Sequence, residues 1–303
     1  MSHRTNYAVR EEGRVRFATD RHGGTSLPDV LFEGEAHVRA WLDEYDAATP
    51  DGLYDEAVCE GLLLLDLDER VVLFDGVSEL MFEGAYRRIW MPLLREIWAG
   101  WQLLHTPEPV RHLGAYLGLP AAWCEAKAPS DPFALTRPTI LSERDLSFVN
   151  DVQTEVQWRA PDGPWSWTVV DVKPLDVLHL GPALLDLAPE TPAVEQRDRL
   201  PPWGVLRIDE RERRLEVWTD VPLVRLVEEA EARWPGWTVV LLSFGEAAAQ
   251  SRQGDRFFLT DAQADRAFVD LRSRLDSPVH MPFGAAVKHV EERSSAGLRS
   301  MRW

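Results

Sequence analysis

The feature that most constrains the fold is an internal repeat, because four short sequence blocks occur twice in the same order along the chain. The blocks are marked by Gly13 and Gly163, Asp29 and Asp176, Gly61 and Gly204, and Trp98 and Trp234. The separation between matching positions falls steadily, from 150 to 147, 143 and 136 residues. A collinear duplication whose second copy has lost short pieces of loop produces this decrease. We therefore expect two diverged copies of one folding unit.

The blocks predict β-hairpins followed by a helix. In the first block, alternating segments flank a polar turn that contains Gly13 or Gly163. In the third block, an apolar run leads into Asp66 or Asp209 and a second apolar run follows, which predicts a hairpin with a solvent-facing turn. The fourth block is Trp-x-Gly-Trp, which is typical of a helix ended by glycine and followed by a strand.

Between the third and fourth blocks, apolar residues recur at helical spacing. They are Tyr86, Trp90, Leu93, Leu94 and Ile97 in the first copy, and Leu223, Val227, Ala230 and Trp234 in the second. Glu228, Glu229 and Arg233 lie off this stripe and are expected to face solvent. In the second copy's last hairpin strand, Leu215 and Val217 are expected to face inward, and Glu216 and Trp218 outward.

The predicted fold class is α+β, a tandem duplication of a module with two antiparallel hairpins, one packed helix and a following strand. We expect the first module at residues 1–119, a connector at 120–150, the second module at 151–250, and a C-terminal helix and tail at 251–303. A variable stretch inside each module is expected to be helical at Glu35–Tyr45 and a loop at Ala188–Pro202, which holds four prolines. The C-terminal helix is expected to be capped by Thr260 or Asp261.

The net charge of −17 over 303 residues bounds the choice of partner. A surface this acidic repels phosphate backbones and anionic lipid headgroups, so neither nucleic acid nor membrane is expected as a partner. It attracts proteins with basic surfaces. The alternative is that the charge only keeps the chain soluble.

The sequence begins without an apolar leader and contains no apolar run long enough to cross a membrane. Its two cysteines, Cys59 and Cys124, form neither a disulfide framework nor a four-ligand zinc site. We therefore expect a cytoplasmic protein. The chain also lacks the glycine-rich nucleotide loops, the nucleophile elbow and the zinc-protease motif, so no cofactor is expected and an enzymatic function is disfavoured.

Four residues are the candidates for a catalytic site, and each has a structural interpretation beside the chemical one. Asp66 and Glu69 belong to an acidic cluster, Asp66-Leu67-Asp68-Glu69, that would suit a metal, but its position favours a hairpin turn. His105 and His112 flank a proline-containing loop and have no titratable counterparts in the second copy.

Two further groups of residues could bind ligands. The pairs Trp98/Trp101 and Trp234/Trp237 could stack on a ligand, although their shared spacing favours core packing. The Arg87-Arg88 pair, with Arg95 two helical turns later, is the best basic patch of the first copy.

Two functions follow from these patterns. The first is a non-enzymatic acidic binding protein, of the inhibitor or immunity type, that binds a basic protein partner. The alternative is an enzyme or small-molecule binder with its site in the cleft between the two modules, where His105, His112, Asp66 and Glu69 would face arginines of the second copy. The charge and the missing motifs favour the first.

Overall fold

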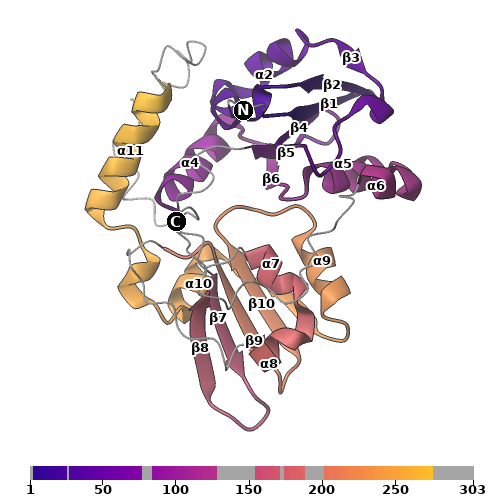
Figure 1. Ribbon diagram of the computed structural model, residues 1–303. Coiled ribbons are helices and arrows are strands. Elements are labelled where there is room, and N and C mark those ends of the chain that lie inside the picture. The colour runs from indigo at the N-terminus through magenta and orange to yellow at the C-terminus, as the bar shows by residue number, and fades with distance from the viewer. Residues whose placement is uncertain are drawn as a thin grey trace.

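The computed structural model describes residues 3–25, 27–76, 84–127, 154–170, 174–187 and 201–275. Most of the expected connector, the proline-rich stretch of the second copy up to residue 200, and the last 28 residues, 276–303, lie outside these ranges. Figure 1 shows the first module above the second, with the helices labelled as below.

The first module holds a six-stranded sheet and the helices around it. Its elements are β1 (Thr5–Glu11), β2 (Arg14–Asp20), α1 (Leu27–Val30), α2 (Gly34–Leu42), β3 (Ala47–Ala48), β4 (Gly61–Asp66), β5 (Val71–Gly76), α4 (Gly84–Ile97), β6 (Gln102–His105), α5 (Pro109–Leu117) and α6 (Ala121–Lys127). Helix α6 lies within the segment expected to be a connector. It packs instead against α5 in this module.

The second module holds a five-stranded sheet, and a further helix follows it. The elements are β7 (Thr154–Arg159), β8 (Trp165–Val170), α7 (Pro174–His179), α8 (Leu184–Leu187), β9 (Gly204–Asp209), β10 (Arg214–Thr219), α9 (Leu226–Arg233), β11 (Thr238–Leu241), α10 (Phe244–Gln250) and α11 (Asp261–Leu275). Thr260 caps α11, since its hydroxyl accepts a hydrogen bond from the Gln263 backbone N–H at 3.3 Å.

The two sheets share one strand order. It is β2-β1-β4-β5-β6 in the first module and β8-β7-β9-β10-β11 in the second, with the short β3 added at one edge of the first. The registers also match, because Thr5 pairs with Gly61 and Thr154 pairs with Gly204. The predicted hairpins and the strand after the helix are thus confirmed, and the two similar modules fit a duplication.

Both sheets are mixed, because parallel strand pairs occur beside the antiparallel hairpins of each module. β1 runs parallel to β4, and β5 runs parallel to β6 across the helix α4. The second module repeats these pairings with β7 beside β9 and β10 beside β11. The β5–β6 and β10–β11 pairs each belong to a strand–helix–strand unit, whose long connection allows the two strands to pair in parallel.

The tryptophan block has the same packing role in both modules. The Trp98 indole N–H donates to the Leu31 carbonyl at 2.7 Å, and the Trp234 indole N–H donates to the Leu178 carbonyl at 3.0 Å. The glycine inside each block ends the helix with a positive φ, 85° at Gly100 and 79° at Gly236, as a left-handed cap requires. Core packing of these tryptophans is confirmed.

The helix of each module lies on one face of its sheet, and each matches the predicted stripe in part. Ile97 of α4 is only partly buried, and the Tyr86 side chain lies outside the described residues. In α4, Trp90, Leu93 and Leu94 are fully buried, as expected. In α9 the helix starts at Leu226, so Leu226 and Ala230 form the buried face. Val227 is only partly buried, and Glu229, expected to face solvent, is 7% exposed.

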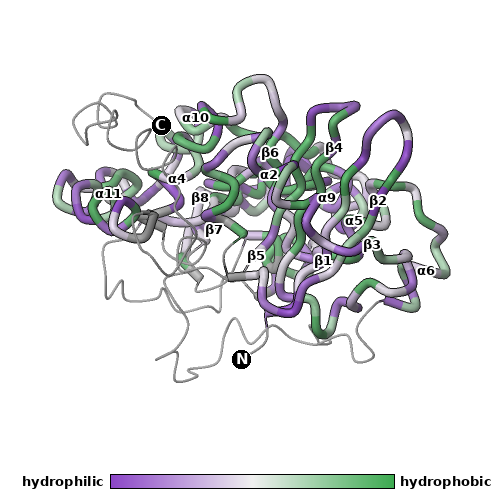
Figure 2. The backbone as a smooth tube through the Cα atoms, turned by 90° about the horizontal axis from the view of Figure 1, so that it is seen from above, coloured by the Kyte–Doolittle hydropathy of each residue, from purple (hydrophilic) through white to green (hydrophobic). Residues whose placement is uncertain are grey.

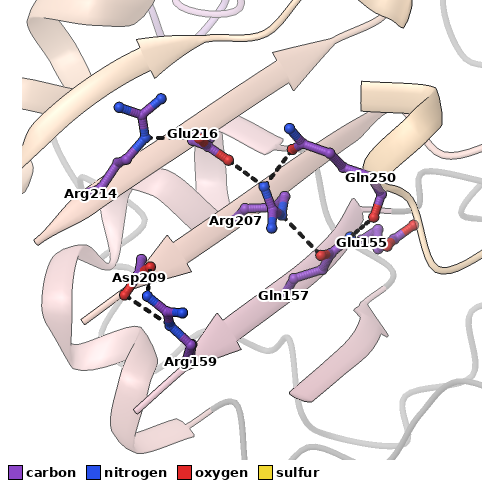
Figure 3. A network of polar contacts seen from close by, with 8 residues as sticks. All are labelled: Glu155, Gln157, Arg159, Arg207, Asp209, Arg214, Glu216 and Gln250. Atoms are coloured by element: carbon purple, nitrogen blue, oxygen red, sulfur yellow. Dashed lines mark hydrogen bonds and ion pairs between the residues drawn. The ribbon is translucent and has the colours of Figure 1, made fainter. Parts of the chain in front are cut away.

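The opposite faces of the two sheets differ in chemistry. In the first module this face is apolar and is covered by α5 and α6, with Leu64 and Leu73 at its centre. At the matching positions the second module has Arg207 and Glu216, whose side chains pair at 2.5 Å (Figure 3). Trp218 lies on this face as predicted, but Phe257 and α10 cover it.

The two modules contact each other through backbone and side chains. His105 at the end of β6 accepts a backbone hydrogen bond from Val224 and donates one to Pro222. Val221 and Val224, which precede α9, are buried in hydrophobic clusters of the first module. Helix α11 lies along α4, where Ala267 and Leu271 join the first module's core (Figure 1).

The hydropathy of α11 agrees with its packing on α4. Hydrophobic and hydrophilic residues recur along this helix, as expected when one face is packed and the other faces solvent (Figure 2). Within the described part of the chain, no helix is both long and apolar enough to span a membrane.

Candidate functional site: a cleft between the two modules

A cleft of about 570 Å³ lies between the modules, which is the size of a small-molecule site. Helix α4 and strand β6 line one side. The end of β10, the segment up to α9, and the start of α10 line the other. The cleft therefore exists only because the modules are docked together. Its walls combine apolar side chains with a small number of charged ones.

Helix α4 presents a second face to this cleft. Arg87, Met91 and Arg95 recur every four residues, so they form a row along the helix beside the buried stripe of Trp90 and Leu94. All three residues of this row line the cleft. Met91 is also part of the first module's buried core, so the row connects that core to the wall of the cleft.

The Arg87 guanidinium is fully buried and crosses the module boundary. Its Nε donates to Asp220 Oδ2 at 2.9 Å, and its planar group lies 3.3 Å from the ring centroid of Trp203. Burial lowers the pKa of Arg87 to about 10, against the opposing effect of Asp220. Burial also raises the pKa of Asp220, which the two neighbouring arginines counteract. The pair is an ion pair held inside a low-dielectric interface.

Arg88 lies in an aromatic box. Its guanidinium carbon is 4.7 Å from the ring centroid of Trp218, 5.3 Å from Phe244 and 5.0 Å from Phe257. One Nη donates to the Pro202 carbonyl at 3.1 Å, but the buried Nε has no hydrogen-bond partner among the described residues. Burial lowers the pKa of Arg88 to about 10, against the opposing effect of Asp220. No carboxylate of the described chain lies within ion-pair distance of Arg88.

The charge of the cleft is opposite to that of the whole chain. Among the described residues that line it, three are arginines and Asp220 is the single carboxylate, which gives a formal charge of +2. Arg95 is exposed and lies at the solvent side, whereas Arg87 and Arg88 lie deeper. Because Arg88 is buried with no carboxylate at ion-pair distance in the described chain, a bound anion would offset part of the cost of burying its charge.

His105 and His112 lie together at the module boundary, beside the cleft. The His105 Nε2 is 3.0 Å from Asp75 Oδ1, and His105 lines a small cavity of about 20 Å³ together with Trp203 and Asp220. Thr219, Asp220 and Leu223 line both this cavity and the cleft. His112 is buried on α5 without a hydrogen-bond partner on either ring nitrogen among the described residues.

Glu229 of α9 connects this region to the second module. It accepts a hydrogen bond from Arg111 at 2.7 Å, lies 3.5 Å from His179, and is 3.9 Å from His112. His179 and Arg111 lower the pKa of Glu229 to about 2 despite its burial. Burial lowers the pKa of His112 to about 4, so its ring is neutral at physiological pH.

Asp66 and Glu69 lie at the other end of the same strands. Asp66 pairs with Val71 across the hairpin, whereas His105 is in register with Phe74. The Asp66 carboxylate accepts hydrogen bonds from the backbone N–H groups of Asp68 and Glu69, both at 3.0 Å, so it shapes the predicted turn. The structure therefore brings the two histidines together and leaves these two acids apart from them.

The polar network on the second module's sheet is the other candidate that the fold offers (Figure 3). Arg207 donates to Gln157 at 3.1 Å and to Gln250 at 2.6 Å, in addition to its bond with Glu216. Because these groups satisfy one another, the network needs no ligand to balance it. Within the described ranges, no group of three or more His, Cys, Asp or Glu residues is placed to hold a metal ion.

The arginines of the cleft can be predicted from the sequence, but their carboxylate and aromatic neighbours in the second module cannot. The sequence marks Arg87, Arg88 and Arg95 as a basic patch on one helix. Arg87, Met91 and Arg95 are four residues apart in turn, a spacing that predicts a row along that helix. Arginines were expected from the second module, but in the cleft they come from the first. Comparison with protein-family models, with curated proteins and with solved structures found no match.

Proposed function

We propose that this chain is a binding protein that holds a small anionic molecule in the cleft between its two modules. The observation that carries the proposal is Arg88, a buried guanidinium that lines the cleft with an unpartnered Nε and no carboxylate at ion-pair distance in the described chain. Arg95 at the solvent side supplies a second positive charge. An anion in the cleft would give the Arg88 guanidinium a charged partner, and the walls from both modules would surround it.

Binding measured by isothermal titration calorimetry with the full chain tests this proposal. Benzoate and inorganic phosphate are the anionic probes, and benzyl alcohol and benzylamine are the neutral and cationic counterparts of benzoate. We expect one saturable site for at least one anion and none for the counterparts. Equal binding of benzoate and benzyl alcohol, or no anion binding at all, would contradict the proposal.

Two variants test whether the anion binds in the cleft. Arg88→Gln removes the buried charge and is expected to weaken anion binding roughly tenfold to a hundredfold, the range of a charge-assisted hydrogen bond. Arg95→Gln changes an exposed residue and is expected to weaken anion binding less, by at most roughly fivefold. The matched control is Arg211→Gln in the turn between β9 and β10, where the Arg211 side chain is 66% exposed. It should leave the affinity unchanged.

A second function rests on the net charge of −17, which favours a basic protein partner. This acidic binding protein, of the inhibitor or immunity type, would associate through long-range attraction and not through the cleft. A basic partner isolated by affinity purification should bind with an association rate that falls roughly tenfold or more as salt rises. An association rate that is independent of salt would remove this second function.

A further inference from the structure

The apolar walls of the cleft narrow the chemical class of the ligand beyond what the charge of the cleft indicates. Most of its lining is apolar. The aliphatic and aromatic residues are Met91, Pro92, Leu104, Val217, Trp218, Pro222, Leu223, Leu226, Leu241, Leu242 and Phe244. The arginines all come from α4, whereas most of these apolar residues belong to β6, β10, β11 and the segment before α9. The site therefore has a charged side and an apolar side.

One apolar residue of the cleft is exposed without a visible structural reason. Leu241 at the end of β11 keeps 51% of its surface accessible, the second highest among the large hydrophobic residues of the described chain that are exposed. It belongs to the wall opposite Arg88 and Arg95. An exposed leucine alone is ordinary, but here it extends a continuous apolar lining toward solvent.

We propose that the ligand is an amphiphilic carboxylate, with its carboxylate at Arg88 and Arg95 and its hydrocarbon chain along the apolar side toward Leu241. This inference rests on the proposed function, because it names the class of anion that the cleft takes. Arginine matches the geometry of a carboxylate through two parallel N–H donors. The apolar wall then adds affinity for each methylene group that leaves water.

The test is a chain-length series of straight-chain carboxylates, namely acetate, butyrate, octanoate and dodecanoate, titrated into the full chain below their critical micelle concentrations. Affinity is expected to rise roughly twofold to fourfold for each added methylene group until the cleft is filled. Octanol and octylamine, which carry the same chain without the negative charge, should bind at least tenfold more weakly than octanoate.

A variant separates the chain contact from the charge contact. Leu241→Asn should weaken octanoate several-fold while leaving benzoate within twofold, because it removes only the far end of the apolar wall. Val269→Asn on α11 is the matched control, since Val269 is 62% exposed and does not line the cleft. Both changes are at exposed positions, so folding should be preserved.

The outcomes distinguish the two proposals. Arginine-dependent binding of benzoate or phosphate with no gain along the carboxylate series would overturn the amphiphile and leave the anion site standing. Absence of binding by every anion would overturn both. A rise with chain length that octanol matches would mean hydrophobic adsorption, and the inference would be wrong.

Discussion

At the scale of single residues, the Arg87–Asp220 pair is the contact whose disruption is expected to destabilise the fold most. Both side chains are buried, and they join helix α4 of the first module to the end of β10 in the second. A buried ion pair contributes little net stability when complete. Removal of one partner is far more costly, because it leaves the other charge desolvated.

We therefore predict that Asp220→Asn lowers the free energy of unfolding by about 3–5 kcal/mol. Arg87→Met should cost a similar amount, and the double variant should cost clearly less than the two changes added together. Urea denaturation of the four proteins measures this cycle. Strict additivity would mean that the two groups do not depend on each other in the folded protein.

His112 gives the residue-scale prediction for pH. Its pKa is about 4 in the folded protein against 6.5 ordinarily, because burial disfavours the charged ring. Between these values the unfolded chain binds a proton that the folded chain does not. The stabilising contribution is therefore present above pH 6.5 and is lost as pH falls toward 4. Glu56 has the opposite sign, because burial raises its pKa to about 7.

The wild-type protein should lose about 2 kcal/mol more stability than His112→Leu when the pH falls from 7 to 5. Chemical denaturation at both pH values measures the difference, and the comparison between variants removes the contribution of Glu56. His22→Asn, a change at an exposed histidine, should behave as the wild type. Parallel pH profiles for wild type and His112→Leu would show that this ring does not titrate as stated.

At the scale of elements, the end of one helix in each module is fixed by the same contact, a buried tryptophan that donates a hydrogen bond from its indole N–H. Trp98 and Trp234 each follow the end of a helix and donate to a carbonyl of the helical crossover. Each also packs edge-to-face on a second tryptophan, with ring centroids 5.2 Å and 5.0 Å apart. Because the contacts match, substitution by phenylalanine should have matching effects.

Trp98→Phe and Trp234→Phe are each predicted to lower the free energy of unfolding by about 1–3 kcal/mol, since each leaves a buried carbonyl without its donor. Thermal and urea denaturation measure both losses. The control Trp167→Phe, at a position that is 46% exposed, should stay within about 0.5 kcal/mol of the wild type. A large loss at one site and none at the other would argue against equivalent roles.

The sequence predicts those elements that are determined by residues close together in the chain, and it does not predict contacts between distant residues. The hairpins and the Trp-x-Gly-Trp helix end are specified by neighbouring residues, so they were predicted. The parallel pairing of β1 with β4 depends on residues about 56 apart, and hairpin patterns do not encode it. Glu229 is buried because Arg111, 118 residues earlier, pairs with it. The aromatic box of Arg88 needs Phe257, which lies beyond both repeats.

At the scale of the whole molecule, the two modules are interlocked. The segment before α9 contributes Val221 and Val224 to clusters of the first module, and α11 returns to cover α4. The boundary also buries the Arg87–Asp220 ion pair, whose charges would lose each other if the modules separated. The cleft with its arginines is a consequence of this docking.

We expect the modules to unfold as one cooperative unit. Far-ultraviolet circular dichroism and tryptophan fluorescence should give coincident urea transitions with one midpoint. In Asp220→Asn the midpoint should move to lower urea while the transitions remain coincident. Two separated transitions in the wild type would mean that the modules are stable independently, and that the cleft is not a permanent feature of the fold.

The most direct measurement of the central claim is a crystal structure of the full chain grown with octanoate. We predict electron density for one molecule between the modules, with its carboxylate within hydrogen-bond distance of Arg88. An empty cleft at saturating octanoate, or a carboxylate bound away from Arg88 and Arg95, would contradict the account.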